Sequence, residues 1–232
     1  MKVLAIIPAR GGSKGIKKKN LINFFGKPLI FWTINAAKKS KLISKIIIST
    51  DSEEIKNYSE TLGIKIDKLR PKSLAMDHSK TIDVINFELE RAEKNNFFPD
   101  YIVTLQPTSP LRNEIHIDNA IKMILKDKNA DSLVSCLNVP HNFSPESLMI
   151  SNGKYIESLS KNKKVDRRQE KKKFIARNGA AIYITKRSKV GRYIFGGRII
   201  PYFMSLIESI DIDCEDDLRL AYVFKKYLIK SK

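Results

Sequence analysis

The first twenty residues constrain the fold most. Residues 3–7 form a short apolar run, Val-Leu-Ala-Ile-Ile, which Pro8 follows. Such a run indicates a buried strand of a parallel sheet, and Pro8 should end it because proline cannot donate to a strand ladder. A turn with glycines at positions 11, 12 and 15 and several basic residues comes next. A strand that ends in a flexible, cationic turn suits a bound triphosphate.

The spacing of these glycines excludes two common phosphate-binding motifs. G-x-x-x-x-G-K-[ST] fails because the residues five positions after Gly11 and Gly12 are Ile16 and Lys17, and G-x-G-x-x-G fails as well. A basic surface turn remains an alternative for this stretch. We expect Gly12 to adopt a positive φ, where valine would be tolerated less well than alanine.

Apolar periodicity predicts an α/β fold. Helical faces recur near residues 29–37, 82–92, 117–124 and 218–228. Apolar runs typical of strands lie at residues 45–50, 64–66, 100–105, 131–137, 174–185 and 199–204. This alternation predicts one mostly parallel sheet flanked by helices. The length of 232 residues suits a single domain over 1–232, with the irregular residues 140–174 as an excursion that contains a hairpin turning at Asn152-Gly153.

Two carboxylates near the C-terminus form a candidate metal site. Asp211 and Asp213 alternate with Ile210 and Ile212, so in a strand both carboxylates would point the same way. Paired carboxylates suit Mg²⁺, which takes its other ligands from water and phosphate. Capping of the last helix is the alternative, and it explains residues 215–217 well.

Composition narrows the classes of partner. The formal net charge is +18, from 43 lysine and arginine against 25 aspartate and glutamate residues. The lysines are dispersed without interleaved aromatics, which favours a solvated basic surface over nucleic-acid binding. No apolar run approaches the roughly 20 residues of a membrane span, and no secretory pattern opens the chain. Cys136 and Cys214 lack metal spacing, so we expect free thiols in a cytoplasmic protein.

Four motifs in order resemble the acylneuraminate cytidylyltransferases, or CMP-sialic acid synthetases. They are residues 7–15 with Lys19-Asn20, residues 105–112, residues 177–180 and residues 209–213. The resemblance covers nearly the whole chain and implies transfer of CMP from CTP to a nine-carbon α-keto sugar acid (a nonulosonic acid), with release of pyrophosphate. An eight-carbon 3-deoxy-octulosonate is an alternative acceptor. A basic nucleic-acid-binding protein is the alternative from another class.

The resemblance also assigns site residues. The catalytic set is Arg10, Lys19, Asp211 and Asp213, of which the two aspartates would hold Mg²⁺. The nucleotide-binding set is Ala9, Arg10, Gly11, Gly12, Ser13, Lys14, Asn20, Arg70, Ser79 and Gln106. The sugar-acid-binding set is Gln106, Arg168 and Arg177.

Three further interpretations accompany these assignments. Gln106 should read a base edge, because its amide both donates and accepts at the end of a strand. Arg112 is either structural or a contact of the sugar acid, and Asp51 is interpreted as a plain helix cap. The family resemblance implies a homodimer in which residues 140–174 pack against a second subunit.

Overall fold

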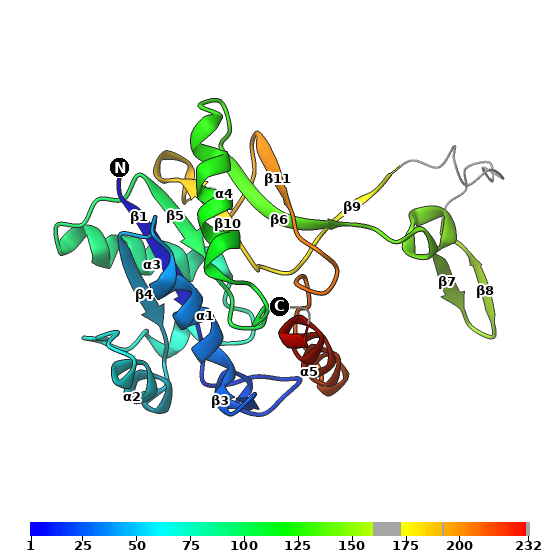
Figure 1. The fold of residues 1–232 in the computed structure, drawn as a ribbon, viewed down its shortest axis with the longest axis horizontal. Coiled ribbons are helices and arrows are strands. Elements are labelled where there is room, and N and C mark those ends of the chain that lie inside the picture. Colours follow the sequence, from blue (N-terminus) through cyan, green and yellow to red (C-terminus); the bar gives the residue numbers. More distant parts are fainter. Residues whose placement is uncertain (160–172, 192, 231–232) are drawn as a thin grey trace.

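A seven-stranded sheet forms the centre of the molecule (Figure 1). The computed structural model describes residues 1–159, 173–191 and 193–230. The strands run in the spatial order β11 (Ile199–Phe203), β6 (Ser132–Asn138), β10 (Tyr183–Lys186), β5 (Tyr101–Thr104), β1 (Val3–Pro8) and β4 (Lys45–Ser49), and β9 (Ile175–Arg177) also pairs with β6.

The sheet is mostly parallel, as the sequence predicts. Strand β1 pairs in parallel with β4 and β5, and β6 pairs in parallel with β11. Only β10 and β9 run against their neighbours among the described strands of this sheet. Residues 3–7 of β1 are fully buried, which agrees with an apolar run covered on both faces.

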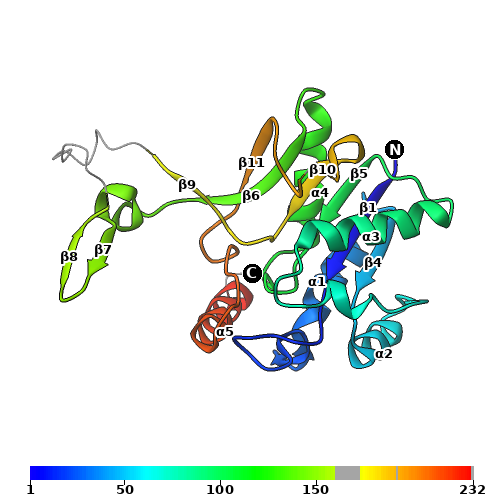
Figure 2. The same ribbon diagram turned by 180° about the vertical axis from the view of Figure 1, so that it is seen from behind.

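Helices cover both faces of the sheet (Figures 1 and 2). Ile30 and Ile34 of α1 and Ile117 of α4 pack on the face that Val3 of β1 presents, whereas Leu89 of α3 packs on the opposite face. Helix α5 packs on a separate apolar cluster that includes the start of α1. The helices are α1 (Leu29–Lys39), α2 (Glu53–Thr61), α3 (Thr81–Lys94), α4 (Glu114–Lys126) and α5 (Glu215–Lys230).

Short elements connect these parts. A small ladder follows the glycine-rich turn, and single 3₁₀ turns occur in the loops. They are η1 (Lys19–Leu21), β2 (Asn23–Phe24), β3 (Lys27–Pro28), η2 (Lys72–Leu74), η3 (His141–Phe143), η4 (Pro145–Ser147) and η6 (Arg187–Lys189).

Two segments with a strand pattern in the sequence, both among the described residues, are not strands. Residues 64–66 lie beside the sheet, but the Ile64 and Ile66 N–H groups donate back to Ser59 and Glu60 of α2 instead of entering the sheet ladder. Residues 209–213 form an irregular connection, in which the Ile212 N–H donates to Thr108 O. The predicted strand 174–185 is split into β9 and β10 by a turn at residues 178–182.

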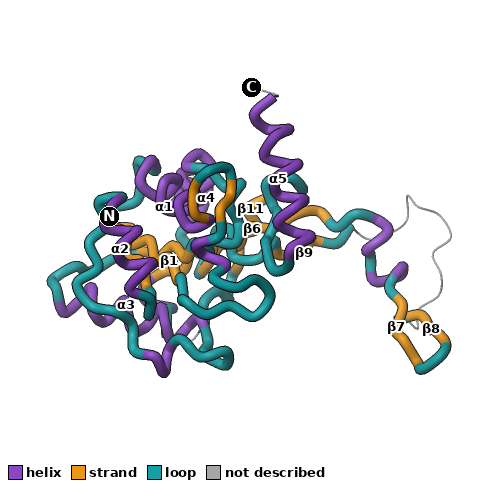
Figure 3. The backbone as a smooth tube through the Cα atoms, turned by 90° about the horizontal axis from the view of Figure 1, so that it is seen from below, coloured by secondary structure: helices purple, strands orange, loops and turns teal. Residues whose placement is uncertain are grey.

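A hairpin extends away from the sheet (Figures 1 and 3). Strands β7 (Met149–Asn152) and β8 (Tyr155–Ser158) pair antiparallel, and Gly153 has φ 62° at the turn, so the hairpin prediction is confirmed. Strands β6 and β9 form the ribbon that leads to the hairpin and back. Every residue of β7 and β8 is exposed. Throughout residues 1–159, 173–191 and 193–230, no helix combines the length and apolar character needed to cross a bilayer.

Candidate active site

The glycine-rich loop, residues 9–20, leaves the carboxyl end of β1, and hydrogen bonds to its backbone hold it in place. Asn20 Nδ2 donates to Arg10 O over 2.9 Å, and the Gly11 N–H donates to Asp51 Oδ1 over 2.9 Å. The interpretation of Asp51 as a helix cap is wrong, because Ser52 caps α2 by accepting from the Ile55 N–H. Asp51 therefore fixes the loop.

Two glycines of the loop allow its backbone to lie close to neighbouring segments of the chain. A Cβ on Gly15 would collide with the carbonyl oxygen of Asp213, and a Cβ on Gly11 would lie 2.9 Å from Cβ of Ser52. Gly12 has open space around it, and its φ lies outside the positive region. The expectation of a positive φ at Gly12 is therefore wrong, and the requirement for glycine is steric and lies at Gly15 and Gly11.

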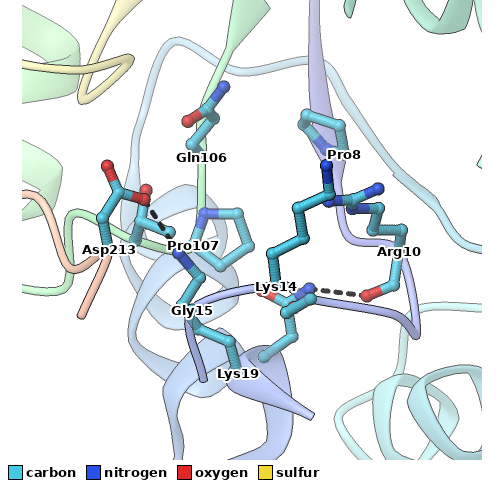
Figure 4. Close-up of a pocket in the computed structure, with 11 residues that line it drawn as sticks. Pro8, Arg10, Lys14, Gly15, Lys19, Gln106, Pro107 and Asp213 are labelled. Carbon is cyan, nitrogen blue, oxygen red and sulfur yellow. Dashed lines mark hydrogen bonds and ion pairs between the residues drawn. The ribbon is translucent and has the colours of Figure 1, made fainter. Parts of the chain in front are cut away.

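Cations of the loop line a cavity of about 370 Å³ (Figure 4). Arg10 Nη1 lies 2.7 Å from Asp77 Oδ1, and Lys14 Nζ lies 3.2 Å from Asp77 Oδ2. On the other side, Lys19 Nζ donates to Asp213 Oδ1 over 2.9 Å and to the backbone carbonyl of residue 212 over 2.8 Å. The cavity thus has the positive charge that a polyphosphate needs.

A second cavity of about 250 Å³ adjoins the first and contains Arg70 and Ser79. Arg70 is only 5% exposed, and its Nη2 lies 3.9 Å from Asp51 Oδ1. Burial lowers the pKa of Arg70, while the nearby carboxylates of Asp51 and Glu88 oppose that effect. A buried guanidinium beside a cavity is suited to bind an anion there.

Gln106 lies where the cavities meet, because it lines both of these and a third. The backbone N–H of Gln106 donates to Ala180 O over 3.0 Å, and its backbone carbonyl accepts from Arg112 Nη1 over 3.2 Å. Arg112 also donates to Ala181 O over 2.8 Å and to Thr33 Oγ1. Burial lowers the pKa of Arg112 to about 9. Of the two interpretations of Arg112, the structural one therefore holds.

The third cavity, of about 660 Å³, combines Arg177 with an apolar wall. The guanidinium of Arg177 stacks 4.8 Å from the ring centroid of Phe195, and its Nη1 lies 3.4 Å from the Tyr183 hydroxyl. Ile194 and Ser79 also line this cavity. Arg168, the other arginine assigned to the sugar acid, lies outside the described residues.

Asp211 is the most unusual group of the site. Its Oδ1 is buried and has no hydrogen-bond partner within the described part of the chain, and burial raises its pKa despite an opposing effect of the Thr108 hydroxyl. Gly179 lies against this carboxylate with a φ of 68°, and a Cβ on Gly179 would collide with the carboxylate. Asn178 Nδ2 donates to Ser209 Oγ over 2.9 Å and so joins the two motifs that carry these residues.

Neither Asp211 nor Asp213 caps α5. Asp217, in the first turn of α5, instead binds the residues before the helix, because its Oδ2 accepts from the N–H groups of Asp213 and Cys214 over 2.9 Å each. The side chain of Asp213 is 78% exposed and pairs with Lys19, whereas Oδ1 of Asp211 is buried and lacks a hydrogen-bond partner in the described part of the chain. Within the described ranges, no three His, Cys, Asp or Glu side chains are grouped to hold a metal ion. Two carboxylates with an orphan oxygen fit Mg²⁺, which needs few protein ligands.

The remaining predicted residues are also placed. Ser13 and Asn20 line the first cavity, where their roles stay predictions. Ala9 is fully buried, and its N–H donates to Ser49 O over 2.8 Å, so its side chain belongs to the core. Sequence reasoning missed Asp77, whose pairs with Arg10 and Lys14 join residues 67 and 63 positions away.

A family model described as cytidylyltransferase matches residues 4–218. This chain belongs to the cytidylyltransferase family. A pseudaminic acid cytidylyltransferase and UDP-2,4-diacetamido-2,4,6-trideoxy-beta-L-altropyranose hydrolase of Helicobacter pylori is 34% identical over 215 residues, 91% of this chain and 40% of that protein. An N-acylneuraminate cytidylyltransferase of Escherichia coli is 32% identical over 231 residues, 97% of this chain and 52% of that protein. The chain thus spans about half the length of these curated relatives.

Solved structures support the fold of this cytidylyltransferase. A CMP:2-keto-3-deoxy-manno-octonic acid synthetase complexed with CTP aligns with a TM-score of 0.72, covering 98% of this chain and 99% of that chain at 17% identity. At this identity the similarity concerns the fold alone. The predicted α/β fold, a mostly parallel sheet flanked by helices, is confirmed.

Proposed function

We propose that this cytidylyltransferase transfers CMP from CTP to a nonulosonic acid and releases pyrophosphate. The observation that carries the proposal is the convergence of three adjoining cavities on Gln106, one cationic, one beside Arg70 and one with an apolar wall. A nucleotide, its polyphosphate and an acceptor need three such neighbouring subsites. The names of the relatives, which include sialic and pseudaminic acid enzymes at 32–36% identity, support a nine-carbon acceptor.

The loop would bind the triphosphate. Arg10 and Lys14 line the first cavity from one side and Lys19 from the other, and the backbone of Gly11 to Gly15 lies between them. Arg70 and Ser79 would hold the rest of the nucleotide in the second cavity. The Gln106 side-chain amide, which both donates and accepts, would recognise the edge of the cytosine ring.

The third cavity would hold the acceptor. A carboxylate suits the Arg177 guanidinium, which can donate two parallel hydrogen bonds to it. Tyr183, Ile194 and Phe195 offer an apolar surface to the substituents of the sugar. An eight-carbon acid remains the second candidate, because the structural neighbour named for such an acid shares the fold. Binding of nucleic acid has no specific observation in its favour.

Asp211 and Asp213 would hold Mg²⁺, which when bound would neutralise phosphate charge near the reacting atoms. Lys19 binds Asp213 and the preceding carbonyl, so it orients this segment toward the loop. The acceptor hydroxyl would attack the α-phosphorus in line. The protein contributes mainly by positioning the reactants and stabilising charge.

A homodimer is part of the proposal. In the hairpin formed by β7 and β8 every residue is exposed, with Tyr155 at 73% and Ile156 at 68%. A two-stranded hairpin is at best marginally stable alone in water, so this apolar arm needs a surface to pack on. A second copy of the chain is the occupant we propose. Sedimentation should give a dimer, and a fully active monomer would contradict it.

A cytoplasmic location is also proposed. Cys136 is buried and Cys214 is exposed, and both thiols are free. Exposed free thiols are typical of proteins in a reducing compartment. Labelling of Cys214 with a thiol reagent in freshly lysed cells would test this, because an oxidised Cys214 would not react.

Pyrophosphate release across a panel of nucleotides and sugar acids tests the activity. We expect release with CTP and a nine-carbon acid, dependence on added Mg²⁺, and little release with other nucleoside triphosphates. An Asp211→Asn variant purified in parallel measures contaminating activity. Release with an eight-carbon acid alone would move the acceptor class to the second candidate, and no release with any pair would reject the proposal.

A further inference from the structure

Asp77 belongs to the connection between Arg70 and α3, yet it contacts the glycine-rich loop. Its two carboxylate oxygens bind different cations: Oδ1 accepts from Arg10 Nη1 over 2.7 Å, and Oδ2 lies 3.2 Å from Lys14 Nζ. The hydrogen bond from Arg10, followed by that from Lys14, has the largest effect on the pKa of Asp77 and lowers it. Asp77 is therefore ionised at neutral pH. One anion thus bridges two cations of the loop.

The position of this bridge separates two subsites. Arg10 lines both the first and the second cavity, whereas Asp77 lines the second. Lys14 lines the first cavity. A nucleotide that extends from the Arg70 cavity to the loop must therefore pass the Arg10–Asp77 pair, and its phosphates would seek the same two cations.

The segment that carries Asp77 is held mostly by its own hydrogen bonds. The Leu74 N–H donates to Pro71 O, the Ser79 N–H to Met76 O, and Ser79 Oγ to Ser73 O. The side chain of Asp77 is 51% exposed. The bridge can therefore open without breaking the turn that supports it, since exposed ion pairs are weak and readily exchanged.

We propose that Asp77 is an internal competitor of the substrate: its carboxylate occupies the cationic subsite of the empty enzyme and is displaced by the terminal phosphates of the nucleotide. The inference rests on the proposed function. A ligand with several phosphates brings enough charge to displace one carboxylate, whereas a monophosphate gains less from doing so. Asp77 thereby increases the preference for triphosphate over monophosphate and aids the departure of pyrophosphate.

A different role for Asp77 predicts the opposite result. If Asp77 instead aligned Arg10 and Lys14 for the phosphates, removing its charge would leave the two cations less ordered and weaken binding. A competitor, once removed, leaves them free and strengthens binding. The sign of the change in affinity therefore distinguishes the two roles.

Calorimetric titration of Asp77→Asn with CTP, inorganic tripolyphosphate, CMP and cytidine tests the inference. We expect CTP and tripolyphosphate to bind about three- to tenfold more tightly than to the wild type, the range expected for two exposed ion pairs. CMP should change less and cytidine not at all. Pyrophosphate should become a correspondingly stronger inhibitor, and all differences should shrink at high salt.

Two variants control for net charge. Glu54→Gln frees Lys18 of the same loop, with which Glu54 pairs over 2.7 Å, and Asp67→Asn breaks an exposed pair with Lys65 elsewhere. Both should bind tripolyphosphate as the wild type does. Unchanged or weaker binding by Asp77→Asn, or equal tightening by Glu54→Gln, would overturn the inference while leaving the proposed function intact. A wild type that binds neither CTP nor tripolyphosphate would overturn both.

Discussion

The two sides of the candidate active site are built in opposite ways. The glycine-rich loop presents cations whose partners, such as Asp77, are exposed and can be exchanged. The segment 209–213 presents Asp211, a carboxylate buried against Gly179 with an oxygen that lacks a partner among the described residues. The cationic side can thus adapt to a ligand. The carboxylate side is fixed before a ligand arrives, at a cost in stability.

Asp211→Asn should have the largest effect and would test the fixed side. Loss of one of the two proposed Mg²⁺ ligands should lower turnover on the order of a thousandfold. The free energy of unfolding should not fall, because the variant no longer buries an ionised carboxylate of which one oxygen lacks a partner. Turnover with and without added Mg²⁺ and melting temperature measure the two effects. Glu215→Gln, in the first turn of α5, is the control and should leave turnover nearly unchanged.

The pH dependence of stability sharpens this prediction. Burial raises the pKa of Asp211 in the folded state, so its ionisation opposes folding. The penalty is absent below about pH 4, where the carboxyl is neutral in both states. It grows as the pH rises through the interval up to the raised pKa, and is complete above it. The stability of Asp211→Asn relative to the wild type should therefore increase over that interval, and a constant difference would contradict the assignment.

Gly179→Ala should have the next largest effect. The new methyl group would collide with the Asp211 carboxylate and would also occupy a positive φ. We expect a loss of about 1–3 kcal/mol in stability and a fall in turnover on the order of a hundredfold from the displaced carboxylate. Gly26→Ala is the matched control, since Gly26 has φ 75° but open space around it. Equal turnover in both variants would show that the contact with Asp211 is dispensable.

Arg10→Ala tests the adaptable side and should have a smaller effect. Loss of a charge-assisted contact to phosphate should raise the KM for CTP roughly tenfold and lower turnover. The melting temperature should hardly change, because the Arg10–Asp77 pair is exposed. Lys18→Ala, which removes a neighbouring loop cation paired with Glu54, is the control. Kinetics equal to the wild type would remove Arg10 from the nucleotide-binding set.

Gly12→Val should have the smallest effect. The position is open and its φ is not positive, so valine should change stability by less than about 0.5 kcal/mol. Gly15→Ala should be more harmful, because its methyl group meets the carbonyl oxygen of Asp213. Thermal unfolding and the KM for CTP would rank the two. A worse result for Gly12→Val would mean that the side chain obstructs the ligand.

The sheet is well predicted from the sequence, because hydrophobic burial determines both the apolar pattern of the sequence and the packing of the elements. The apolar run of β1 predicts a strand buried on both faces, and the apolar faces of α1, α3 and α4 predict helices that pack on the sheet. Residues 64–66 have the same apolar pattern without being a strand, since their N–H groups satisfy the end of α2. The alternation at Asp211 and Asp213 is likewise typical of a strand, yet the segment is irregular, and the Ile212 N–H between them donates to Thr108 O.

Site residues that belong to sequence motifs can be predicted. Residues whose importance depends on a single long-range contact cannot. Lys19 and Asp213 come from recognisable motifs and do meet. Asp51 and Asp77 look like ordinary loop residues, because their significance depends on which part of the glycine-rich loop folds against them. The burial of Asp211 has no signal in the residues beside it, because Gly179, which lies against its carboxylate, is distant in the sequence.

The contact between Lys19 and Asp213 joins residues 194 positions apart, and this affects how the protein is made. At roughly 5–20 residues per second, about ten to forty seconds separate their synthesis on the ribosome. Strands β5, β1 and β4 can pair early, but β6 cannot reach them until β10 has been made to fill the place between. Such long-range closure slows folding. A nascent chain therefore displays its cationic loop well before the carboxylates that complete the site exist.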